Sequence, residues 1–83
     1  MDIEIRAARS KALLNHEHFR DTMQDLRERQ KDVFANSAAS DVEGREEAHA
    51  ILRALNAIEY MLKADVDAVT LLKKRKEQHR GND

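Results

Sequence analysis

The chain has few of the residues that cross-link a fold or interrupt a helix. It contains no cysteine, no proline, no tryptophan, two glycines, one tyrosine and two phenylalanines. The lack of cysteine excludes disulfides and thiolate metal sites. The lack of proline, with so little glycine, leaves almost nothing to break a helix. So few aromatic residues are also unusual for a small-molecule pocket. These absences favour long helices and argue against a protein built around a ligand.

Long hydrophobic runs are missing as well. No stretch approaches the roughly 20 apolar residues that cross a membrane, and no charged start followed by an apolar segment indicates a signal peptide. We therefore expect a cytoplasmic setting, in a host cell or inside a virion, and no membrane partner. Hydrophobic residues at 41% and charged residues at 37% argue against disorder. Good helix formers dominate, as in long helices and coiled coils.

The length of the chain limits how large a core it can build. With 83 residues we expect one helical domain over residues 1–83. A domain this small buries only about 60% of the surface of its unfolded chain. Small proteins compensate with disulfides, a metal or self-association, and the first route is closed here. We therefore expect a homo-oligomer and also a protein partner.

One turn is expected in the middle of the chain, at residues 37–40. The Asn, Ser and Asp side chains around it bond nearby backbone amides and so compete with helix continuation. Ser40 followed by Glu43 matches a capping box, in which each side chain bonds the free amide of the other residue. A helix is therefore predicted over about residues 41–79, ending in a basic run, with residues 80–83 as a frayed tail.

The first half of the chain is less regular. We favour helices over about residues 3–14 and 16–36, with Asn15 as the cap of the second and Glu17 in its first turn. The alternative is one continuous helix over residues 3–36. In either case the first half folds back along the second. The predicted fold is all-α: an antiparallel helical hairpin, with a short extra N-terminal helix if the chain breaks at Asn15, assembling into a helical bundle.

Two apolar stripes run along the predicted helix of residues 41–79, because apolar residues recur there at spacings of three and four. The first stripe is Ile51, Leu55, Ile58, Leu62, Val66 and Val69, and the second is Ala54, Ala57, Met61, Ala64, Ala68 and Leu71. Together they are wider than one partner helix covers, so we expect them to form a self-association or partner interface. The alternative is that alanine is present only for its helix propensity.

No group of residues predicts catalysis. His16 and His18 point about 200° apart on a helix, so they do not form a shared metal site. The carboxylates of residues 20–32 alternate with Arg and Lys, as on a solvated, ion-paired surface. No nucleophile elbow and no phosphate-binding glycine loop is present. We therefore expect no enzyme activity, no metal, no cofactor and no small-molecule substrate.

The charge distribution carries one further signal. Residues 73–83 hold five Lys or Arg against two acidic residues, while the whole chain has a net charge of −1. Such a basic helix end can contact nucleic-acid phosphates or an acidic partner. It equally compensates the helix dipole and aids solubility. The candidate contact residues are Lys73, Lys74, Arg75, Lys76 and Arg80.

Three short patterns resemble one family. They are Ala12-Leu13-Leu14-Asn15 with Phe19, the segment Ser40 to Glu47, and Leu55-Asn56-Ala57-Ile58. They resemble a loose group of small helical proteins of tailed bacteriophages and prophages, encoded among head and packaging genes. The similarity covers about residues 12–72. His16-Glu17 replaces the Asp-Pro common in the group, and Phe34 matches its aromatic residue before the turn. The resemblance implies a phage origin and a structural or assembly role, with no catalytic residue.

Three hypotheses follow from these patterns. The first is a small phage-type structural or interaction protein that acts through helix–helix packing. The second is a nucleic-acid-binding accessory, similar to a small packaging subunit, that uses the basic helix end. The third is a small protein inhibitor that binds a host enzyme through its acidic face. Phosphate contacts weaken steeply as salt rises, so salt dependence separates the second hypothesis from the first.

Overall fold

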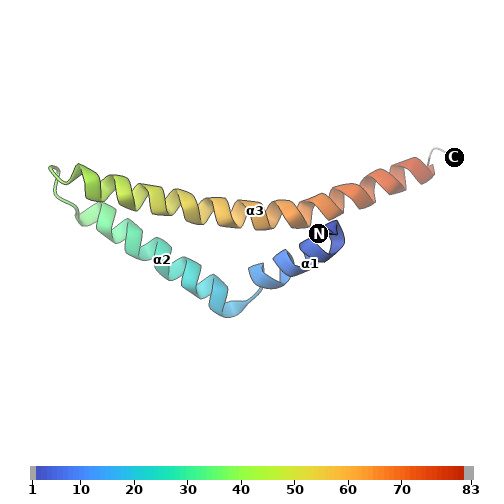
Figure 1. The fold of residues 1–83 in the computed structure, drawn as a ribbon, viewed down its shortest axis with the longest axis horizontal. Coiled ribbons are helices and arrows are strands. Elements are labelled where there is room, and N and C mark those ends of the chain that lie inside the picture. The colour runs from blue at the N-terminus through green and yellow to red at the C-terminus, as the bar shows by residue number, and fades with distance from the viewer. Residues whose placement is uncertain (1, 82–83) are drawn as a thin grey trace.

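The computed structural model describes residues 2–81, with side chains as far as His79. Its elements are the helices α1 (Ile3–Leu14), α2 (Glu17–Asn36) and α3 (Val42–Gly81). The described residues form no strand, so the all-α prediction is confirmed. Helices α1 and α2 follow one another along the same side of the much longer α3 (Figure 1). The fold is thus a hairpin whose first arm is broken in two, and the break lies where Asn15 was expected to produce it.

The break between α1 and α2 uses different cap residues from those predicted. Asn15 ends α1, and its backbone N–H donates to the carbonyl of Lys11 at 3.0 Å. His16, and not Asn15, is the N-cap of α2: its Nδ1 accepts the backbone N–H of Phe19 at 3.4 Å. The prediction that Asn15 caps α2 is therefore wrong. The residue is used instead to satisfy carbonyl groups at the end of the preceding helix.

The N-cap of α3 also lies one residue later than predicted. Asp41 lies just before α3, and its Oδ1 accepts the backbone N–H of Gly44 at 3.0 Å. Ser40 lies in the turn, so the Ser40–Glu43 capping box does not form. The Arg45 guanidinium donates to two turn carbonyls, those of Ala38 at 2.6 Å and Ala39 at 3.0 Å. Helix α3 then continues to Gly81, two residues past the expected end, and residues 82–83 of the expected tail lie outside the described part.

The core of the chain is very small. Among residues 2–79, four apolar residues are buried: Ala7, Met23, Ala48 and Leu55. Both α1 and α2 pack on α3, and they hardly contact each other. The radius of gyration is 18.5 Å, whereas a compact domain of this length has about 12 Å. Helix α3 is therefore the element that holds α1 and α2 together.

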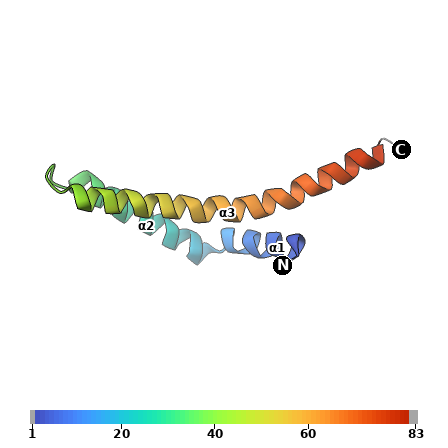
Figure 2. The same cartoon turned by 45° about the horizontal axis from the view of Figure 1, so that its top comes forward.

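Helix α3 is bowed along its length. In two views that differ by 45°, α1 and α2 lie on the convex side of the bow (Figures 1 and 2). The C-terminal end of α3 also extends past α1. The concave side of α3 faces away from the rest of the chain.

Candidate functional site

The inner face of α3, which α1 and α2 cover, contains most of the first apolar stripe. Leu55 is 5% exposed, and Ile51, Leu62, Val66 and Val69 are half-buried. Val66 and Val69 line a shallow groove together with Ala7 of α1. Ile58 lies at the edge of the inner face and is 44% exposed. These predicted interface residues are therefore used, wholly or in part, by packing within the chain.

A cluster around Asp65 joins α1 to the inner face. The hydroxyl of Ser10 donates to Asp65 Oδ2 at 2.7 Å, and Arg6 Nε lies 3.0 Å from Asp65 Oδ1. Ser10 is buried at 5% exposure, and burying a hydroxyl is costly unless it is hydrogen-bonded. Asp65 is thus the acceptor that lets Ser10 lie inside the α1–α3 contact. We call these three residues the Asp65 cluster.

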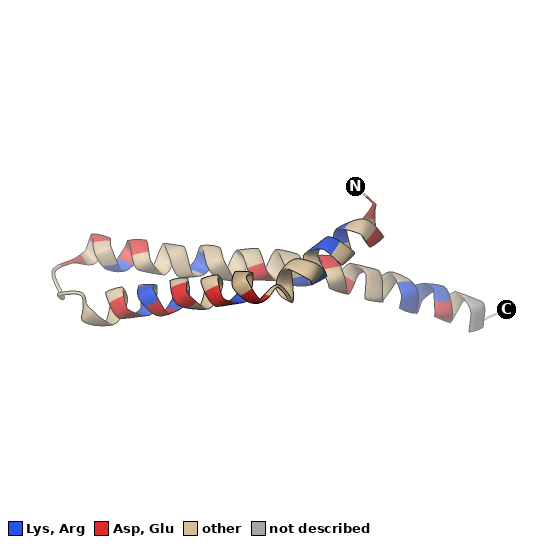
Figure 3. Ribbon diagram, turned by 90° about the horizontal axis from the view of Figure 1, so that it is seen from below, with Lys and Arg blue, Asp and Glu red and all other residues tan. Residues whose placement is uncertain are grey.

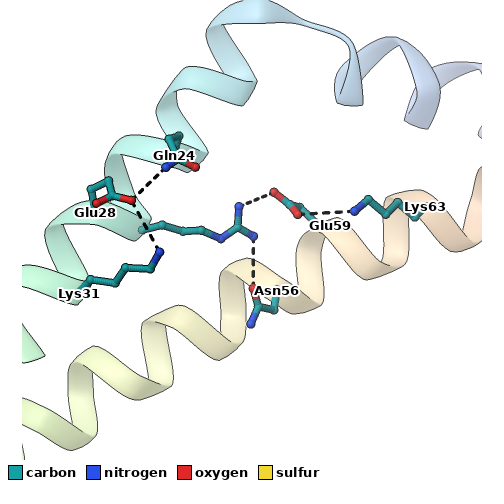
Figure 4. A network of polar contacts seen from close by, with 7 residues as sticks. Gln24, Glu28, Lys31, Asn56, Glu59 and Lys63 are labelled. Carbon is teal, nitrogen blue, oxygen red and sulfur yellow. Dashed lines mark hydrogen bonds and ion pairs between the residues drawn. The ribbon is translucent and has the colours of Figure 1, made fainter.

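A second cluster joins α2 to α3 near the middle of the molecule (Figure 4). Arg27 donates from Nη1 to Glu59 Oε1 at 2.6 Å and from Nη2 to Asn56 Oδ1 at 3.3 Å. The hydrogen bond from Arg27 holds the pKa of Glu59 below its ordinary value, against the opposing effect of burial. Glu59 also lies 4.0 Å from Lys63. We call Arg27, Asn56 and Glu59 the Arg27 cluster.

Neither cluster was predicted from the sequence. The charges of residues 20–32 were expected to form a solvated, ion-paired surface, and Glu28 lies on such a surface: its carboxylate bonds only Gln24 and Lys31 of the same helix. Arg27 instead reaches across to α3. The available signal was on α3, where Asp65 falls among apolar residues in the register of the first stripe. A carboxylate at such a position needs a partner.

The second apolar stripe lies on another side of α3 and is largely uncovered. We define the outer face by seven residues, and all of them are exposed except the half-buried Ala68. Met61 is 59% exposed and Leu71 is 51% exposed. Tyr60, beside this face, is 73% exposed. The outer face consists of Ala50, Ala54, Ala57, Met61, Ala64, Ala68 and Leu71. The described chain offers nothing to cover it.

The basic end of α3 is exposed but does not form one surface. Lys73, Lys74, Arg75 and Lys76 are all exposed, near the C-terminal end of the helix (Figure 3). Four consecutive helical residues point in four directions about 100° apart. The side chain of Arg80 lies outside the described residues. The arrangement therefore surrounds the helix with positive charge and lacks the single-sided stripe that tracks a nucleic-acid backbone.

The geometry of the described residues gives no metal site. Within residues 2–79 no three His, Asp or Glu side chains converge in a way that would hold a metal ion. In the same part of the chain, no helix combines the length with the apolarity that crossing a membrane requires. The features that stand out are the outer face and the two polar clusters that orient it.

Comparison with known proteins finds no relative: no family model, no curated protein and no solved structure matches the chain. The surfaces and contacts of the chain are therefore what indicates its function.

Proposed function

We propose that this chain is a small, non-enzymatic structural or assembly protein of phage type that acts through helix–helix packing. Its setting would be the host cytoplasm or a virion. The observation that carries the proposal is the outer face of α3, an exposed apolar surface on a chain whose described part buries four apolar residues. Large exposed apolar faces mark interaction sites on proteins of this kind.

The surface area of the chain supports this proposal. Its accessible surface is 6847 Å², whereas a compact monomer of 9.6 kDa has about 5,100 Å². The excess of about 1,700 Å² exceeds the roughly 800 Å² that each partner buries in an interface of standard size. The chain thus exposes enough surface for an interface of standard size.

Solution mass measured by light scattering tests the proposal. We expect a multiple of 9.6 kDa that persists in high salt and is unchanged by duplex DNA. Met61→Glu places a charge on the outer face and should lower the mass. Thr22→Glu adds the same charge at an exposed position of α2 and should not. A monomer in every condition would contradict self-assembly.

The same measurement separates the nucleic-acid alternative. A complex with DNA that dissociates as salt rises would favour an accessory that uses the basic end of α3. Replacing Lys73, Lys74, Arg75 and Lys76 with Gln should then abolish that complex. If the wild-type chain does not bind DNA at low salt, this alternative is excluded.

A further inference from the structure

The outer face has the regular spacing of a coiled-coil seam. From Ala50 to Leu71 its residues are separated by four, three, four, three, four and three positions. This is the seven-residue repeat by which one helix packs along another. Alanine predominates in it, and small residues allow two helix backbones to approach closely. Charged Glu47 and Arg75 occupy the next positions of the repeat at either end.

A column of residues beside the outer face carries charges whose signs are antisymmetric about its middle residue. Its members are seven residues apart: Glu46, Arg53, Tyr60, Asp67 and Lys74. The signs are negative, positive, neutral, negative and positive. Reversing the column about Tyr60 places an opposite charge opposite every charged member. Arg53 and Asp67 form no ion pair within the described part of the chain.

The shape of α3 points to an occupant on the side that α1 and α2 leave uncovered. Long helices curve around the core on which they pack, with their convex side toward solvent. Helix α3 has the opposite curvature relative to α1 and α2, which lie on its convex side (Figures 1 and 2). A shallow hollow on α3 is lined by residues of both the outer face and the charged column, including Tyr60, Ala64, Asp67 and Leu71. A bow of this sense is expected of a helix that wraps around a partner on its free side.

We infer that the occupant of the outer face is α3 of a second copy of this chain, running antiparallel, with the two-fold axis passing close to Tyr60. This rests on the proposed function and specifies the partner and its orientation. The antiparallel register places Arg53 beside Asp67 of the second copy, and Glu46 beside Lys74. A parallel pair would instead set the charged column beside Ile51, Ile58, Asp65 and Leu72, where no such complementarity exists.

Charge reversal at one pair tests the orientation. Arg53 and Asp67 are separated by fourteen residues, or about 21 Å along the helix, so they cannot pair within one chain. Arg53→Glu and Asp67→Arg should each raise the dimer dissociation constant about tenfold, because each change turns two attractive contacts into repulsive ones. The double variant R53E/D67R should restore nearly wild-type affinity. Arg29→Glu reverses an exposed charge on α2 and should have no effect.

Cross-linking gives an independent measure of direction. In the proposed register Ala54 lies opposite Ala64 of the second copy. A mixture of A54C and A64C chains with different mass tags should form the mixed disulfide, while each alone should not, since the two copies of residue 54 would be about 15 Å apart. Self-linked A54C would indicate a parallel pair and overturn the inference.

The outcomes separate this inference from the proposed function. An oligomer that is indifferent to R53E and D67R, or whose weakening is not rescued by the double variant, overturns the antiparallel dimer and leaves assembly by helix packing in place. A wild-type chain that remains monomeric overturns both. Dimerisation with reciprocal rescue and the mixed disulfide supports both.

Discussion

Replacing Asp65 with alanine should release α1 from the rest of the protein. The substitution removes the hydrogen bond from the buried Ser10 hydroxyl, at 2.7 Å, and the ion pair with Arg6, at 3.0 Å. A hydrogen bond to a charged group contributes about 1.5–3 kcal/mol. The ion pair contributes about 0.2–1 kcal/mol, because the Arg6 side chain is 54% exposed. We therefore expect D65A to lower the free energy of unfolding by about 2–3 kcal/mol.

This loss is large relative to what a chain of this size can have. At about 0.05–0.15 kcal/mol per residue, 83 residues give a total stability of roughly 4–12 kcal/mol. The effect should also be local. Helix α1 has 12 residues, and an isolated helix of that length is marginal in water. Its amides should therefore exchange with solvent much faster in D65A, while those of α2 should change little.

Urea denaturation at fixed protein concentration and amide hydrogen exchange provide the two readouts. D65N keeps an acceptor for Ser10 and should lower the free energy of unfolding less than D65A does. The double variant S10A/D65A should be less destabilised than the sum of its single changes, because the two residues share one contact. Asp25→Ala, at an exposed site on α2, serves as the control. A D65A protein within about 0.5 kcal/mol of wild type, the range of ordinary surface changes, would refute the role given to the Asp65 cluster.

Three further predictions concern acid stability and helix caps. Arg27 lowers the pKa of Glu59. The ionised carboxylate therefore stabilises the fold at pH values above the pKa of Glu59 in the unfolded chain, and this stabilisation is lost as the pH falls through the lowered pKa of the folded chain. In Glu59→Gln and Arg27→Gln, the urea midpoint should therefore fall less steeply with decreasing pH than in wild type. Asp41→Ala removes the cap of α3 and should lower the free energy of unfolding, measured by urea denaturation, by about 1 kcal/mol. Ser40→Ala should leave it almost unchanged. A larger loss in Ser40→Ala than in Asp41→Ala would support the Ser40–Glu43 capping box instead. His16→Asp should raise stability by about 0.5–1 kcal/mol, because Asp is a better N-cap and complements the helix dipole; unchanged thermal unfolding would count against the cap seen at His16.

The three helices were predictable because their signals are local. Polar residues that bond nearby amides occur at both breaks, and the long apolar periodicity of residues 51–69 is uninterrupted. The choice of cap was harder. Ser40 and Asp41 are both good N-caps, and the outcome depends on which residue begins the first turn of α3. That is set by how the turn closes, including the bonds from Arg45 to the turn carbonyls.

Contacts between helices could not be predicted in the same way. Whether Arg27 meets Glu59 depends on the register of α2 along α3, which follows from the exact length and shape of the turn. Periodicity identifies two apolar stripes on α3 but does not say which one α1 and α2 cover. The stripe with larger side chains, including Leu55 and Leu62, buries more apolar area and is the one that they cover.

The polar clusters add to this choice of face. If α3 rotated so that α1 and α2 covered the alanine-rich outer face, Ser10 would lose Asp65 and Arg27 would lose Glu59. Leaving a buried hydrogen-bonding group without a partner costs about 1–3 kcal/mol, so the rotated packing is penalised even though both faces are apolar. The two clusters therefore do more than hold α1 and α2 in place. By fixing which side of α3 is covered within the chain, they determine that the outer face, with its seven-residue spacing and antisymmetric charges, remains free for a second helix.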